Sequence, residues 1–156
     1  MKMLNRLGLL ALIGVIVVSA CDDDDETGPT DRRFTATLNG ANERPNPVTT
    51  TAVGTMTMTV PNTSNQMSWT LNVTNIPAND TLTLAHIHKG VADSAGSVIV
   101  NFNPAFPLTG AAVTLNGSVA VPDSVFTLIA GNRAYVNVHS KRSPGGVIRG
   151  QIVPQP

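Results

Sequence analysis

Apolar and polar residues alternate along most of the chain after residue 33, which is the pattern of half-buried β-strands. In the segment VGTMTMTV, for example, Met56, Met58 and Val60 fall on one face and the threonines between them fall on the other. A short helical turn is expected at DSVFTLIAGN, residues 123–132. The alternation predicts strands at residues 34–38, 53–60, 67–73, 81–88, 97–102, 113–121, 134–140 and 147–153.

Turn-forming residues gather between these runs, as in GANERPNP and KGVADSAG. Only 4% of the residues are aromatic and 13% are charged, while threonine and valine, which favour strands, are abundant. Short strands separated by turns are typical of antiparallel sheets. We therefore predict an all-β fold, an antiparallel Greek-key-like β-sandwich or a partly closed barrel of about eight to nine strands.

The first 20 residues follow a different pattern. Lys2 and Arg6 precede the apolar run LGLLALIGVIVVSA, which predicts a secretory signal peptide over residues 1–20. The residues VVSAC resemble the lipobox of bacterial lipoproteins, and this resemblance implies that Cys21, the only cysteine of the chain, carries lipid. The alternatives are an uncleaved membrane anchor or ordinary signal cleavage near Ala20.

An acidic, turn-rich run, DDDDETGPTD, follows Cys21 directly. Such a run cannot bury apolar surface, so residues 21–32 are expected to form a disordered tether that begins at the lipidated cysteine. We therefore expect an exported protein that lipid anchors in the cell envelope, in the outer membrane, facing either the periplasm or the cell surface. The chain has no basic patch that would indicate a nucleic-acid partner.

The three histidines of the chain all lie in strand-like runs: His86 and His88 in LAHIHKG and His139 in YVNVHS. Residues two apart on a strand share a face, about 6.6 Å apart, and a neighbouring strand lies about 4.8 Å away. If the two runs are neighbours, three neutral imidazoles can converge on one ion, a ligand set that favours copper or zinc over magnesium or calcium. In the structural alternative, the histidines cap strand ends and hydrogen-bond to carbonyls or to Glu43 and Asn137.

Four segments in this order, FTATLNGANERP, LAHIHKG, AYVNVHS and SPGGVIRGQI, resemble the CHRD domain, a repeat named after chordin and also found singly in bacterial exported proteins. The likeness covers residues 33–153 and assigns the domain to residues 33–156. Val147 stands where an acidic residue commonly follows PGG, and the Pro-Pro pair that usually follows Glu43 is broken into Pro45-Asn46-Pro47.

The resemblance to CHRD domains implies no established enzymatic activity. The leading hypothesis is therefore a non-enzymatic cell-envelope lipoprotein whose one CHRD domain is a binding or structural module. Its partner would be an unknown protein, glycan or small ligand, besides the membrane that holds its lipid.

A weaker likeness, in AHIHKG, VNFNP, VNVHS and GGVIRG, is to copper-zinc superoxide dismutase. It implies that the three histidines are copper ligands and that Arg149 lies near the position of that enzyme's anion-guiding arginine. The structural alternative is that Arg149 pairs with a carboxylate such as that of Glu43. Because the bridging histidine, the zinc ligands and the disulfide have no counterparts, dismutase activity is not expected. A copper- or zinc-binding protein with a redox or metal-handling role is the alternative function.

Overall fold

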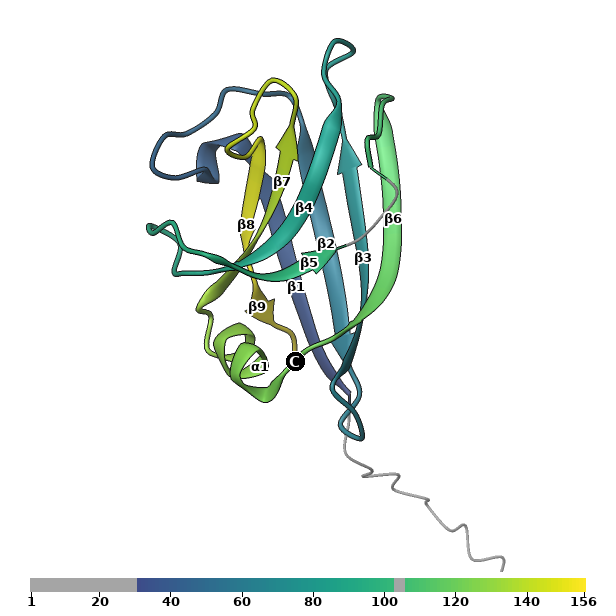
Figure 1. Ribbon diagram of the computed structural model, residues 1–156, viewed down its shortest axis with the longest axis vertical. Helices are drawn as coiled ribbons and strands as arrows, with labels where there is room; N and C mark the ends of the chain where they lie inside the picture. Colours follow the sequence, from purple (N-terminus) through teal and green to yellow (C-terminus); the bar gives the residue numbers. More distant parts are fainter. Residues whose placement is uncertain (1–30, 103–105) are drawn as a thin grey trace, which may run out of the picture.

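The computed structural model describes residues 31–102 and 106–156 (Figure 1). The predicted signal peptide, Cys21 and the tether up to residue 30 lie outside the described residues. No helix among the described residues is both long enough and apolar enough to cross a bilayer. The described elements are β1 (Arg32–Asn39), the 3-10 turn η1 (Gly40–Asn42), β2 (Val53–Val60), β3 (Gln66–Thr74), β4 (Leu82–Lys89), β5 (Val98–Phe102), β6 (Ala112–Ala120), α1 (Asp123–Ala130), β7 (Ala134–Ser140), β8 (Ile148–Gln151) and β9 (Val153–Pro154).

The strands of the described chain form one antiparallel sheet in the order β5-β4-β7-β8-β1-β2-β3-β6, with β9 added beside β1. The sheet curls into a nearly closed barrel, and α1 lies near β9 at one end of it (Figure 1). The all-β prediction is therefore confirmed in its partly closed barrel form. In this order β4 and β7, which carry the histidines, are direct neighbours although a long stretch of sequence separates them.

The barrel interior contains the apolar faces that the alternation predicts. Met56, Met58 and Met67 are buried, as core residues should be. The ring centroids of Trp69 on β3 and Phe102 on β5 lie 4.7 Å apart, so these two strands contact each other through side chains in the interior. Observed strand bounds agree with the predicted ones to within two residues, and those of β2 and β7 coincide with them, except that the last predicted strand is divided into β8 and β9.

Strand β7 is buried at every residue, although it lies in a barrel wall with one outer face. Alternate residues beginning at Ala134 belong to the core, while Tyr135, Asn137 and His139 point outward. Two loops contact these outward side chains: Gly96 of the loop between β4 and β5 bonds to Tyr135, and Pro144 of the loop that follows β7 bonds to His139. The outer face of β7 is therefore a sheltered polar surface, and the candidate site lies there.

Candidate metal centre

The pairing of β4 with β7 places the histidines on one face. In the antiparallel register His86 is opposite Asn137, His88 is opposite Tyr135, and Leu84 is opposite His139. Side chains of directly paired residues project from the same side of a sheet. The core residues Ala85 and Ile87 alternate with the histidines on β4, so the histidines face outward.

The structure brings the three imidazoles together. One ring nitrogen from each of His86, His88 and His139 lies within 4.8 Å of the others. The centroid of the His86 ring lies 5.7 Å from that of His88 and 5.1 Å from that of His139. Convergence of the two strands, on which the metal hypothesis depends, is therefore present in the fold.

Backbone carbonyls fix the orientation of two of the rings. The Nδ1 atom of His88 lies 2.9 Å from the carbonyl oxygen of Gly96, and Nδ1 of His139 lies 2.9 Å from that of Pro144. A carbonyl oxygen only accepts hydrogen bonds, so in each neutral ring Nδ1 carries the hydrogen and Nε2 carries the lone pair. The buried Nε2 atom of His88 has no hydrogen-bond partner within the described part of the chain.

The electrostatics of the cluster favour neutral rings. The pKa of His86 is lowered to about 4, mainly by burial and in smaller part by the nearby His139 and His88. Burial also lowers the pKa of His88, against the opposing effect of its hydrogen bond to Gly96. Neutral imidazole is the form that binds metal ions, so both rings are in the binding form at neutral pH.

The spacing of the nitrogens can be compared with the geometry of a metal site. Bonds of about 2.0 to 2.1 Å in a tetrahedral arrangement separate ligand nitrogens by about 3.3 Å. His86 Nδ1 and His139 Nε2 are 3.3 Å apart, which matches this separation. Since no two of the three ring nitrogens are more than 4.8 Å apart, the rings need to approach one another by at most about 1.5 Å. The donor set thus fits a copper or zinc ion with one coordination position left for a small ligand.

Glu43 and Asn137 form a buried polar pair beside the cluster. The amide Nδ2 of Asn137 donates to Oε2 of Glu43 at 3.2 Å, while Oε1 of Glu43 and Oδ1 of Asn137, both buried, have no partner among the described residues. Burial raises the pKa of Glu43 to about 7, although the hydrogen bond from Asn137 and the charge of Arg149 act in the opposite direction. The structural alternative for the histidines included hydrogen bonds to carbonyls or to Glu43 and Asn137. His88 and His139 do bond to carbonyls, those of Gly96 and Pro144, and not to Glu43 or Asn137.

Arg149 contacts backbone carbonyls where a carboxylate was expected. Its Nη2 group donates to the carbonyl oxygens of Val91 and Ser94, at 2.9 and 2.7 Å, because the loop after β4 folds over the guanidinium. The guanidinium carbon also lies 3.5 Å from the ring centroid of Tyr135. Burial lowers the pKa of Arg149, and the electrostatic effects of the nearby Tyr135 and Glu43 act in the opposite direction. Glu43 therefore affects Arg149 only through its electrostatic effect. The predicted ion pair between them is replaced by hydrogen bonds from Arg149 to the loop carbonyls.

Sequence reasoning missed three contributors to the site: Tyr135 and the carbonyls of Gly96 and Pro144. Tyr135 precedes Asn137 and His139 at the same spacing of two, so the strand pattern could have placed it on their face. The two carbonyls lie in glycine- and proline-containing loops, where residue type gives no indication of what the backbone oxygen binds.

Together, the fold and the cluster define an antiparallel β-barrel domain with three histidines gathered on the outer face of two adjacent strands. Residues 34–152 match the CHRD domain family, and the chain belongs to this family. Comparison with the curated proteins and with the solved structures gave no match. The likeness to superoxide dismutase therefore rests on the short sequence segments alone.

Proposed function

We propose that this CHRD domain binds one copper or zinc ion through His86 Nδ1, His88 Nε2 and His139 Nε2. The observation that carries the proposal is the buried, unpartnered Nε2 atom of His88, in a cluster where one nitrogen of each ring lies within 4.8 Å of the others. A buried polar atom without a partner is costly unless something satisfies it, and a metal ion would do so. Geometry thus favours the metal-binding alternative over a module that binds through its loops alone.

The function proposed is metal binding in a non-enzymatic module. Within the described residues, no cysteine or carboxylate joins the three histidines as a further ligand. All-imidazole sites follow the general affinity order in which copper(II) exceeds zinc(II), so copper is expected to bind more tightly. A copper ion held there would supply a redox-active centre, and a zinc ion would supply a Lewis acid.

The proposal includes an envelope location. Lipid on Cys21 and the acidic residues of the tether would hold the barrel outside a membrane, because two or more acyl chains anchor a protein stably. Strand β1 begins at Arg32, so only a short stretch of chain separates the lipid-bearing residue from the folded domain. At this location the histidine cluster would meet metal ions outside the cytoplasm.

Metal analysis of the purified protein tests the proposal. Residues 22–156 are incubated with Cu(II) or Zn(II), freed of excess metal, and analysed for metal per chain beside a variant in which all three histidines are alanine. We expect one ion per chain in the wild type and none in the variant, which contains no other histidine. Asn101→Ala is the matched control, because Asn101 pairs with His86 from β5 and offers no imidazole. Failure of the wild type to retain metal, or equal retention by the triple variant, would show that the cluster is structural.

A further inference from the structure

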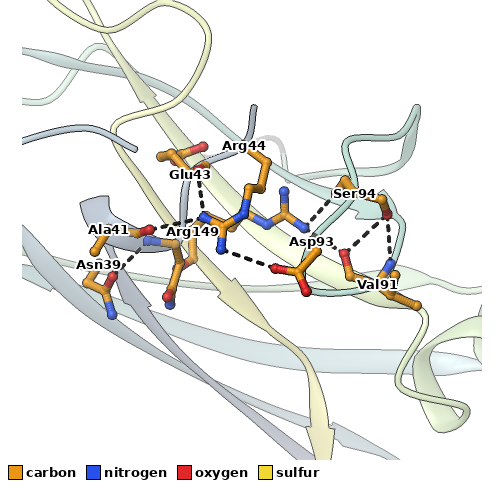
Figure 2. Close-up of polar contacts among 9 residues, drawn as sticks. Asn39, Ala41, Glu43, Arg44, Val91, Asp93, Ser94 and Arg149 are labelled. Carbon is orange, nitrogen blue, oxygen red and sulfur yellow. Dashed lines mark hydrogen bonds and ion pairs between the residues drawn. The ribbon is translucent and has the colours of Figure 1, made fainter. Parts of the chain in front are cut away.

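The loop between β4 and β5, residues 90–97, is attached to the domain from several directions. The nitrogen of Gly90 donates to the carbonyl of Arg133, and Arg149 from β8 donates to Val91 and Ser94. Figure 2 shows Arg149 and Arg44 reaching this loop from outside it, with Asp93 of the loop as the partner of Arg44. The same loop supplies the carbonyl of Gly96 that binds His88. Its position therefore bears directly on the histidine cluster.

These attachments differ in how strongly they can hold the loop. The ion pair of Arg44 with Asp93, at 3.2 Å, is at the surface, with side chains 29% and 88% exposed. Exposed ion pairs contribute little because water screens them and both side chains lose freedom. Arg149 is only 2% exposed, so its guanidinium has few alternatives to the two loop carbonyls. The buried contacts should therefore determine where the loop lies.

Tyr135 contacts both His88 and the loop, and His88 contacts the same loop. Its ring is stacked on that of His88, with centroids 5.0 Å apart and planes 10° apart, and the Arg149 guanidinium lies 3.5 Å from the same Tyr135 ring. Its hydroxyl oxygen accepts the Gly96 N–H at 3.1 Å, and the Gly96 carbonyl in turn lies 2.9 Å from Nδ1 of His88. One residue thus sets the plane of the His88 ring and also fixes the carbonyl that selects its tautomer.

We propose that Tyr135 and Arg149, acting through residues 90–97, are the positioning residues that hold His88 as the Nδ1–H tautomer with Nε2 directed at the other two histidines. The role in metal affinity rests on the proposed function, whereas the tautomer of His88 is a property of the metal-free protein. Neither residue is a ligand. Partners that orient a metal-binding imidazole through its second nitrogen typically change metal affinity by one to two orders of magnitude.

The required movement of His88 gives the loop a second role. Ring nitrogens that lie within 4.8 Å reach the tetrahedral separation by an approach of at most about 1.5 Å, and Gly96 must follow any movement of His88 if the hydrogen bond to Nδ1 is to survive. Because the Gly96 N–H is held by Tyr135, the ring, the carbonyl and the loop must shift together. A change that loosens the loop should therefore disturb the orientation of the His88 ring as well as break one hydrogen bond.

Tyr135→Phe tests this inference with the whole mature chain. The phenylalanine ring keeps the stacking on His88 and Arg149 but leaves the Gly96 N–H without its acceptor. Nitrogen-15 NMR of the metal-free protein reports the His88 tautomer, and competition titration with Zn(II) reports affinity. We expect a single Nδ1–H tautomer in the wild type, a mixture in the variant, and an affinity about tenfold lower.

Two further variants make the result decisive. Gly96→Ala displaces the loop without changing Tyr135, because an added Cβ would clash with the carbonyl of Lys89, and it should reproduce both effects. Asp93→Asn removes only the exposed ion pair and should leave both readouts within about twofold of the wild type. An unchanged His88 tautomer in Tyr135→Phe and Gly96→Ala overturns the inference even if the wild type binds metal. A wild type that binds no metal ends the proposed function, while the tautomer measurement still decides the inference.

Discussion

The Nδ1 atom of His86 lies 3.3 Å from the Nε2 atom of His139. Because His139 places its Nδ1 hydrogen on the carbonyl of Pro144, the hydrogen between the two rings belongs to His86. In the metal-free protein the two rings are therefore joined by an N–H···N hydrogen bond in the place where an ion would bind. A bound ion must replace that hydrogen, which makes the tautomer of His86 an indicator of metal binding.

We predict that zinc changes the tautomer of His86 alone. Metal-free protein should contain His86 as the Nδ1–H form, and saturation with Zn(II) should convert it to the Nε2–H form, because Nδ1 becomes the ligand. His88 and His139 should keep their Nδ1 hydrogens on the Gly96 and Pro144 carbonyls in both states. Nitrogen-15 chemical shifts of the ring atoms distinguish the forms. If His86 keeps the Nδ1 hydrogen at full zinc occupancy, the assigned ligand nitrogen is incorrect.

Two adjacent glycines give a matched pair of substitutions in the loop that covers Asn137. Gly146 has φ +138°, and a Cβ added there would lie 2.6 Å from Asn137 Oδ1 and 2.7 Å from Glu43 Oε2. Gly146→Ala should therefore destabilise the domain by about 2 to 3 kcal/mol through backbone strain and displacement of the buried pair. A Cβ at Gly145 would meet nothing within 4 Å, so Gly145→Ala should change the free energy of unfolding by less than about 0.5 kcal/mol. Chemical denaturation measures both, and similar losses in the two variants would contradict this account.

Strand positions and core residues were predictable because a single physical rule determines both. A strand that packs one face against a core must alternate, so the alternating methionines of residues 53–60 identified β2 at its observed bounds, Val53–Val60. The same rule placed His86 and His88 on a shared face before the partner strand was known. What the rule cannot supply is which strand lies next to which, since that depends on how the sheet closes.

The parts of the site that escaped prediction depend on the backbone of distant loops. Arg149 was expected to find a carboxylate, but the loop carbonyls of Val91 and Ser94 satisfy its guanidinium. Any residue type offers a carbonyl, so the sequence of the loop does not indicate this contact. The last predicted strand was divided for a similar reason. Ile152, buried between β8 and β9, gives its N–H to the carbonyl of Ala134 on β7, and the chain then pairs with β1.

Cys21→Ser tests the predicted lipid anchor. In a bacterial host that processes lipoproteins, the wild-type chain should partition with membranes and carry acyl chains on Cys21. The serine variant should appear in the soluble fraction or as an unprocessed precursor, because serine has no thiol to receive the lipid. Fractionation and mass spectrometry of the N-terminal peptide measure the outcome. Lipid on the serine variant, or a wild type without lipid, would show that the lipobox resemblance misleads.

The pair formed by Glu43 and Asn137 predicts a dependence of stability on pH. With one amide hydrogen bond between them, each side chain still has one buried acceptor without a partner. A proton on Oε1 of Glu43 would let the carboxyl donate to Oδ1 of Asn137 and satisfy both acceptors. The pKa of Glu43, raised by burial from 4.5 to about 7, is consistent with a retained proton. In the native state this carboxyl should thus remain neutral in mildly acidic solution.

The sign of the effect follows from the raised pKa. Below pH 4.5 Glu43 is protonated in both the native and the unfolded chain. Between pH 4.5 and about 7 only the unfolded chain releases the proton. The contribution of Glu43 to stability therefore falls as the pH rises through this range. Glu43→Gln should remove this loss, because its amide can donate to Asn137 Oδ1 at any pH. Above pH 7 the variant should be more stable than the wild type by about 1 to 3 kcal/mol, measured by urea unfolding at several pH values. Asp123→Asn, which removes an exposed carboxylate elsewhere in the domain, is the control for the loss of one negative charge. A Glu43→Gln profile parallel to the wild type would show that Glu43 is ionised in the native state.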